Sequence, residues 1–83
     1  MSAPEITARL NEIFREVFDD PSIQIFDGMT AKDVAGWDSL NHINLVVHAE
    51  RAFGVKFTTK EITSLKNVGE FVAAIERKRA AGA

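Results

Sequence analysis

The sequence predicts an all-α fold, a small antiparallel four-helix bundle with three main helices, one short helix and a long first loop. Apolar residues recur at three- and four-residue spacing in three separate stretches. Residues that favour helix starts and stops flank those stretches. The alternating segment from Val55 to Phe57 is too short to require a sheet. We expect the 83 residues to form a single domain over 1–83.

The first helix is expected to begin beside Ser2. Ser2 and Glu5 match a capping box, and Pro4 lies in the first turn, where its missing N–H costs nothing. One face of this helix is apolar and should be buried. Its residues are Ile6, Leu10, Ile13, Phe14 and Val17. An Asp-Asp-Pro sequence follows Phe18, so we expect the helix to end near that residue.

A long loop is expected from the end of this helix to Trp37. It contains one proline, two glycines and only scattered apolar residues. Loops longer than about 12 to 15 residues are uncommon in compact domains unless they pack into the core or serve a function. Ile25 and Phe26 are the predicted anchors of this loop.

The second main helix is expected to have Asp38 as its N-cap and Gly54 as its stop signal. Four residues are predicted to face inward. They are Ile43, Val46, Val47 and Phe53. Leu40 and Leu45 widen the apolar arc of this helix. An arc this wide either packs on two sides or leaves apolar surface for a partner.

The short helix and the last helix complete the bundle. A helical turn is predicted from Lys60 to Thr63. Asn67 followed by Glu70 is a capping pattern for the last helix. The buried face of that helix is predicted to contain Val68, Phe71, Val72 and Ile75. Residues 80–83 are expected to be frayed.

Composition excludes several classes of function. The chain has no cysteine and two histidines, so we expect neither a disulfide framework nor a metal site. No apolar run approaches the ~20 residues that span a bilayer, and the start lacks a signal-peptide core, so a cytoplasmic location is expected. Residues 1–50 carry a net charge of −6 and residues 51–83 a net charge of +4. The basic residues form no continuous stripe, which argues against nucleic-acid binding.

Ser39 is the residue best placed for chemistry. It follows the predicted N-cap Asp38 and lies at the positive end of a helix, where unpaired N–H groups favour an attached anion. A phosphate ester on the Ser39 hydroxyl would suit this position. The Asp38 carboxylate could help hold a divalent cation during transfer of a phosphoryl group.

Four segments of the chain together match the pattern of a known protein family. They are the long loop into Gly36-Trp37-Asp38-Ser39-Leu40, then His42-Ile43-Asn44-Leu45, Phe53-Gly54-Val55-Lys56-Phe57 and Lys66-Asn67-Val68-Gly69-Glu70-Phe71. On these segments the chain resembles the acyl carrier protein family across its whole length. The resemblance implies that Ser39 carries 4′-phosphopantetheine from coenzyme A, attached by a magnesium-dependent phosphopantetheinyl transferase. It also implies a carrier that holds acyl groups as thioesters for a fatty-acid-like or secondary-metabolite pathway.

The resemblance further implies that the second helix is the recognition surface, with Leu40, His42, Ile43 and Glu50 as partner-binding residues. The implied partners are the transferase, an acyl- or aminoacyl-loading ligase, and downstream synthase or transferase enzymes. Best-known members carry acids along this helix, whereas here histidine, asparagine and arginine intervene, so electrostatic docking should be weaker. In this respect the chain is more similar to specialised, stand-alone bacterial carriers than to the housekeeping fatty-acid carrier. A monomer is expected.

Three alternatives stand beside the acyl carrier. The first is an aminoacyl or peptidyl carrier of a nonribosomal pathway, and the second is a protein-interaction module whose Ser39 is never modified. The third, a serine hydrolase using Ser39 and His42, is disfavoured because the G-x-S-x-G elbow and an orienting third residue are missing. We therefore predict no catalytic residues and no enzymatic activity. His42 is expected at the helix surface, and Trp37 at the edge of the core.

Overall fold

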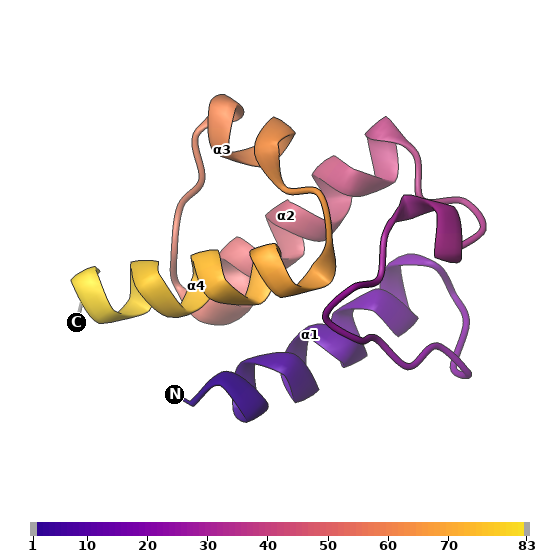
Figure 1. Cartoon of the computed structure of the whole chain (residues 1–83), viewed down its shortest axis with the longest axis horizontal. Helices are drawn as coiled ribbons and strands as arrows, with labels where there is room; N and C mark the ends of the chain where they lie inside the picture. Colours follow the sequence, from indigo (N-terminus) through magenta and orange to yellow (C-terminus); the bar gives the residue numbers. More distant parts are fainter. Residues whose placement is uncertain (1, 83) are drawn as a thin grey trace.

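A computed structural model describes residues 2–82 and contains four α-helices and one short 3₁₀-helix in that range. The elements are α1 (Ala3–Val17), η1 (Ala31–Asp33), α2 (Ser39–Phe53), α3 (Thr59–Ser64) and α4 (Val68–Gly82). Helix α1 packs against both α2 and α4, and both run back against the direction of α1 (Figure 1). The described residues include no strand, so the predicted all-α bundle is confirmed.

The predicted helix ends of α1 and α2 are confirmed. The Ser2 side chain accepts a bond from the Glu5 N–H, the Glu5 side chain reaches back to Ser2, and α1 gives way to its C-cap at Phe18. Asp38 caps α2 by accepting a bond from the Asn41 N–H at 2.9 Å. Gly54 ends α2 in the left-handed conformation, with φ of 67°.

The core is formed by one face of each long helix together with residues from the loops. On α1, the predicted Ile6, Leu10, Ile13 and Phe14 are buried, and Val17 is half-buried against them. The predicted face of α4 is buried as well. Among the side chains described, the buried ones are all apolar. The bundle is therefore held by hydrophobic burial rather than by internal charges.

The anchors of the first loop differ in part from the expectation. Ile25 is half-buried and packs against the core as predicted, but Phe26 is 53% exposed, and Ile23, Met29 and Val34 are buried instead. The reason is that the backbone of this loop forms hydrogen bonds with residues far along the chain. The carbonyl groups of residues 27 and 29 accept bonds from the first two N–H groups of α4, at 2.8 and 3.0 Å. These bonds set the path of the loop, and the path decides which side chains turn inward.

The buried face of α2 also differs from the expectation. Val46 and Phe53 are buried as predicted, but Ile43 and Val47 are 49% and 36% exposed. Leu45 and Ala49 are buried in their place. Because the apolar arc of α2 is wider than the surface that α1 and the rest of the bundle can cover, packing selects part of the arc and leaves the remainder in solvent.

The C-terminal half follows the predicted elements. Residues 55–57 form a loop, α3 covers the predicted turn, and Asn67 accepts a bond from the Glu70 N–H at 2.8 Å. Residues 80–82, for which we expect fraying, belong to the last turn of α4, and Ala83 lies outside the described residues. The Lys78 ammonium bonds to Glu61, and the Arg79 guanidinium donates to the Phe53 carbonyl, so the last turns of α4 are tied to the bundle.

Candidate functional site

Ser39 is the first residue of α2 and is exposed. The turn before it is closed by Asp38, whose carboxylate caps the helix, and by Asn41, whose side-chain amide donates to the Gly36 carbonyl at 2.7 Å. Gly36 has φ of 88°, a left-handed conformation that favours glycine. These contacts present the Ser39 hydroxyl at the N-terminus of a fifteen-residue helix, where the helix dipole favours a negatively charged substituent.

Trp37 anchors this turn to the core, as predicted. Its ring is half-buried and packs edge-on against Phe14 at a centroid distance of 5.2 Å. It also lies 6.4 Å from the ring of Phe18. The indole Nε1–H donates to Nδ1 of His42 at 3.1 Å. The residue two positions before Ser39 is therefore fixed by both packing and a hydrogen bond.

His42 and Glu50 have roles that the sequence did not indicate. His42 was expected at the helix surface, but it is half-buried, and its Nε2 lies 2.8 Å from the Ile62 carbonyl oxygen of α3. Glu50 is also half-buried, and its carboxylate accepts a bond from the Phe57 N–H at 2.8 Å. Both side chains tie α2 to the segment that follows it, and this use is invisible in the sequence because it depends on tertiary contacts.

Three apolar side chains of α2 are exposed in a row. Leu40 is 68% exposed, and Ile43 and Val47 follow at helical spacing. We call these three residues the α2 apolar stripe. It begins one residue after Ser39, so a protein that engages Ser39 would meet the stripe as well.

A pocket of about 730 Å³ opens beside Ser39, between α2 and α3. Its apolar lining comes from Trp37, Ile43, Ile62 and Leu65, and its polar lining includes Thr59, Thr63 and Lys66. Asp38, Ser39 and His42 also line it. The pocket therefore combines apolar and polar side chains next to the Ser39 hydroxyl. The exposed hydroxyl, the helix N-terminus and this pocket lie next to one another.

The pair formed by Glu61 and Lys78 holds α3 to α4. The Lys78 ammonium lies 2.9 and 2.8 Å from the two carboxylate oxygens of Glu61. It also lies 5.0 Å from the centre of the Phe57 ring. The bond from Lys78, followed by the bond from the Thr58 N–H, lowers the pKa of Glu61 from 4.5 to about 2.

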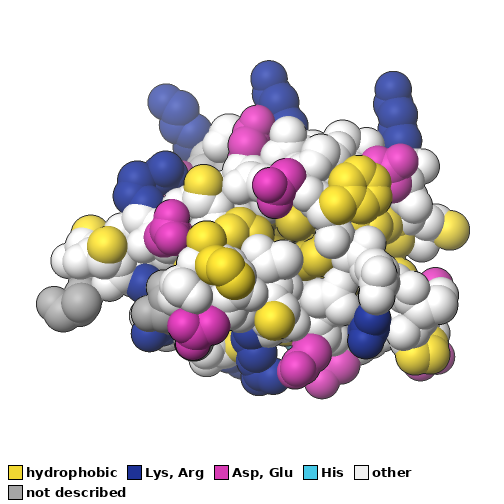
Figure 2. Space-filling view, turned by 60° about the horizontal axis from the view of Figure 1, so that its bottom comes forward, with side chains coloured by type: hydrophobic (Ala, Val, Ile, Leu, Met, Phe, Trp, Pro, Cys, Tyr) yellow, Lys and Arg dark blue, Asp and Glu magenta, His cyan; other side chains and the backbone are white. Residues whose placement is uncertain are grey.

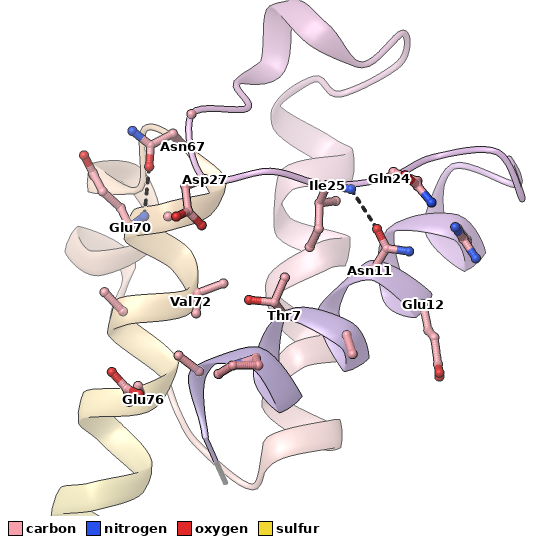
Figure 3. Close-up of a pocket in the computed structure, with 17 residues that line it drawn as sticks. Thr7, Asn11, Glu12, Gln24, Ile25, Asp27, Asn67, Glu70, Val72 and Glu76 are labelled. Atoms are coloured by element: carbon pink, nitrogen blue, oxygen red, sulfur yellow. Dashed lines mark hydrogen bonds between the residues drawn. The ribbon is translucent and has the colours of Figure 1, made fainter.

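A second and larger groove, of about 1200 Å³, lies between α1, the first loop and α4. Figure 2 shows apolar side chains in the centre of this face, with acidic and basic side chains around them. Several of its polar groups serve the fold. In Figure 3, Asn11 accepts a bond from the Ile25 N–H and Asn67 caps α4. Ser39 is not among the residues lining this groove, so the candidate chemistry belongs to the α2–α3 side.

Within residues 2–82, no cluster of three or more histidine, cysteine or acidic side chains is arranged to hold a metal ion. No helix in the same range is long and apolar enough to cross a membrane. The features present around Ser39 are an exposed hydroxyl, a neighbouring pocket and the α2 apolar stripe.

Comparison with known proteins gives consistent similarities. Residues 8–75 match the family described as "Phosphopantetheine attachment site". The chain is 36% identical to an acyl carrier protein of Acidothermus cellulolyticus over 87% of this chain and 86% of the relative. It is 32% identical to a meromycolate extension acyl carrier protein of Mycolicibacterium aurum, over 92% and 78% of the two chains. The solution NMR structure of a holo acyl carrier protein from Geobacter metallireducens has a TM-score of 0.86 and 40% identity, and covers 93% of this chain and 88% of its own.

Proposed function

Because the chain belongs to the acyl carrier protein family, we propose that Ser39 is the residue to which its 4′-phosphopantetheine is attached. The carrier role and the cofactor follow from family membership. The choice of Ser39 rests on one observation above the others: an exposed hydroxyl at the start of α2, directly after a capping aspartate and beside a pocket. When bound, the cofactor supplies a terminal thiol that holds the cargo as a thioester.

Ser39 is the acceptor in the attachment step. Its Oγ forms a bond to the phosphorus that carries the pantetheine arm in coenzyme A, and the bond from that phosphorus to the nucleotide half breaks. The serine proton leaves to the transferase, which supplies the catalysis. The N-terminus of α2 then stabilises the resulting phosphodiester, because backbone N–H groups and the helix dipole favour negative charge there.

Asp38 has two roles in this proposal. Its Oδ1 caps α2 and so holds the backbone on which Ser39 stands. Its carboxylate can also contribute a ligand to the magnesium ion that the transferase brings to the phosphate. The chain itself carries no catalytic residue in this scheme and acts as a carrier rather than an enzyme.

The partner surface is proposed to be the α2 apolar stripe, from which Leu40 and Ile43 were expected as partner-binding residues. Its exposure supports contact with the phosphopantetheinyl transferase, the loading ligase and the downstream synthase or transferase enzymes. His42 and Glu50 contribute differently, because their internal bonds hold the segments beneath that surface. The face is apolar rather than acidic, so its docking should depend only weakly on salt.

The proposed cargo is an acyl group, with an aminoacyl or peptidyl cargo of a nonribosomal pathway as the alternative. The acyl reading is favoured because the relatives carry that name. A cytoplasmic, monomeric carrier remains our prediction. A competition between loading ligases for acyl and aminoacyl groups, read by intact mass of the pantetheinylated protein, distinguishes the two cargo classes.

Intact-mass measurement tests the attachment site. The protein is incubated with coenzyme A, Mg²⁺ and a broad-specificity phosphopantetheinyl transferase. We expect a mass gain of one phosphopantetheinyl group in the wild type and none in Ser39→Ala. Ser22→Ala removes another exposed serine, from the first loop, and should be modified like the wild type. A mass gain that persists in Ser39→Ala, or no gain in the folded wild type with several transferases, would contradict the proposal.

A further inference from the structure

The His42 imidazole lines the pocket beside Ser39 and uses both ring nitrogens in hydrogen bonds. The indole nitrogen of Trp37 can only donate, so Nδ1 of His42 is the acceptor of that bond. The ring proton then lies on Nε2, which donates to the Ile62 carbonyl oxygen at 2.8 Å. His42 thus bridges the loop before Ser39 to α3 as a neutral imidazole. We call this chain of two bonds the His42 bridge.

Helix α3 has few other attachments on this side. It has six residues and no fully buried side chain, and Ile62 and Leu65 are only half-buried. Ile62 lies in the last turn, where carbonyl groups lack the usual partner within the helix. The Leu65 N–H reaches the same oxygen at only 3.5 Å, a much longer bond than the one from His42. In Figure 1, α3 is drawn at the top of the view and α1 at the bottom. The His42 bridge therefore ties a weakly packed helix to α2.

From this geometry we propose that His42 is a specificity-determining residue that keeps extended apolar cargo from entering between α2 and α3. The inference rests on the proposed attachment at Ser39. An alkyl chain that pushed between the helices would displace the imidazole. It would leave the Trp37 N–H without its partner and the Ile62 carbonyl with only the long bond from the Leu65 N–H, and a chain of methylene groups offers no replacement bonds.

The lining of the pocket agrees with a short or polar cargo. The polar residues Thr59, Thr63 and Lys66 lie among the lining residues, together with His42 itself, and the Thr63 hydroxyl donates to the Lys60 carbonyl. A short acyl group with a polar end keeps these groups hydrated or bonded and leaves the His42 bridge closed. A long alkyl chain gains burial only by opening it.

The test compares cargo length with and without the bridge. Acetyl- and octanoyl-phosphopantetheine are transferred to Ser39 from the corresponding acyl coenzyme A, and cleavage of each thioester by hydroxylamine is followed by intact mass. In the wild type we expect the two thioesters to be cleaved at rates within about twofold, because neither is buried. In His42→Val the octanoyl thioester should be cleaved about fivefold more slowly than the acetyl one, because the pocket between α2 and α3 then extends past the position of the imidazole and its lining becomes more apolar.

His48→Val is the matched control, since His48 is an exposed histidine on the same helix. It should behave like the wild type. Trp37→Phe keeps an aromatic ring in the core and removes one bond of the bridge, so it guards against a folding defect in His42→Val and should give intermediate protection of the octanoyl thioester. Protection of the octanoyl thioester in the wild type, or its absence in both bridge variants, would overturn the proposal.

Failure to load Ser39 is a separate outcome that contradicts the proposed function. In that case, hydrogen exchange of the unloaded protein still tests whether the His42 bridge holds α3. Amides of α3 should exchange faster in His42→Val than in the wild type, while those of α1 keep their protection. Unchanged exchange in α3 would show that His42 does not hold it, and would overturn the inference independently of any loading.

Discussion

The α1–α4 side and the α2–α3 side of the bundle are built differently. On the first, buried apolar faces meet, and the loop is joined to the start of α4 by two backbone hydrogen bonds. On the second, α3 has no buried residue, and side-chain bonds from His42, Glu50 and Lys78 hold α3 and the segment before it. The exposed apolar stripe, Ser39 and its pocket all lie on this second side. The more extensively buried side, α1–α4, has no proposed chemistry. The proposed site lies on the α2–α3 side, where fewer side chains are buried.

The largest expected effect is on the core of the first side. Phe14 is fully buried and contacts the rings of Phe18 and Trp37. Phe14→Ala should lower the free energy of unfolding by about 3 to 5 kcal/mol, through lost burial and the cavity that remains. Urea denaturation measures this. Phe26→Ala, at a 53% exposed position, is the control and should change it by less than about 0.5 kcal/mol. An equal loss of unfolding free energy in the two variants would mean that the Phe26 ring is buried in solution.

A second prediction concerns the contact between the loop and α4. A Cβ atom at Gly69 would lie 3.0 Å from the Asp27 carbonyl oxygen and 3.3 Å from the Asp27 Cβ. Gly69→Ala should therefore destabilise the protein by about 1 to 2 kcal/mol, although alanine favours helix formation. Gly28→Ala is the matched control, because a Cβ there meets nothing within 4 Å. A stabilising Gly69→Ala would show that the loop moves aside without cost.

The third prediction is that the stabilisation from the Glu61–Lys78 pair, on the α2–α3 side, depends on pH. The pKa of Glu61 is lowered to about 2 by the bond from Lys78, against an ordinary value of 4.5. The stabilisation from this pair is therefore complete above about pH 4.5 and is lost as the pH falls towards 2. In Lys78→Met, the difference in thermal midpoint between about pH 6 and about pH 3 should be smaller than in the wild type.

Arg9→Met is the control for that experiment. Arg9 pairs with Glu12 on the surface of α1 at 2.9 Å, with both side chains at least half exposed. Exposed pairs of this kind contribute little, so the acid sensitivity of Arg9→Met should match that of the wild type. If Lys78→Met also matches the wild type, the Glu61–Lys78 pair does not stabilise the attachment of α3.

The smallest expected effect on stability is at the exposed stripe. Leu40→Ala should change the free energy of unfolding by less than about 0.5 kcal/mol, because Leu40 is 68% exposed. The same change should slow phosphopantetheinyl transfer to Ser39, since it removes apolar surface beside the acceptor. Transfer is measured by intact mass over time. Phe26→Ala, an exposed apolar side chain of the first loop, should leave the transfer rate unchanged, and a Leu40→Ala rate equal to the wild-type rate would argue against the stripe as a docking surface.

Local signals in the sequence were sufficient for the helix ends and for α1. Ser2 with Glu5, Asp38 and Gly54 act within one turn of the chain, so their roles depend on few distant contacts. The same locality allowed Ser39 to be placed at a helix N-terminus. Of the two predicted loop anchors, Ile25 packs against the core but Phe26 does not, because a loop has no periodicity and its path is set by bonds to α4, some forty residues away.

The sequence by itself determined the all-α class, the caps, the faces of α1 and α4, and the position of Ser39 at the start of α2. Only the tertiary structure decided which part of the wide α2 arc is buried, that Ile43 and Val47 face solvent, and that α4 continues to Gly82. It also decided that His42 and Glu50 bind neighbouring backbone groups. The physical reason is range: capping and periodicity act over one to four residues, whereas burial and these hydrogen bonds depend on segments that only folding brings together.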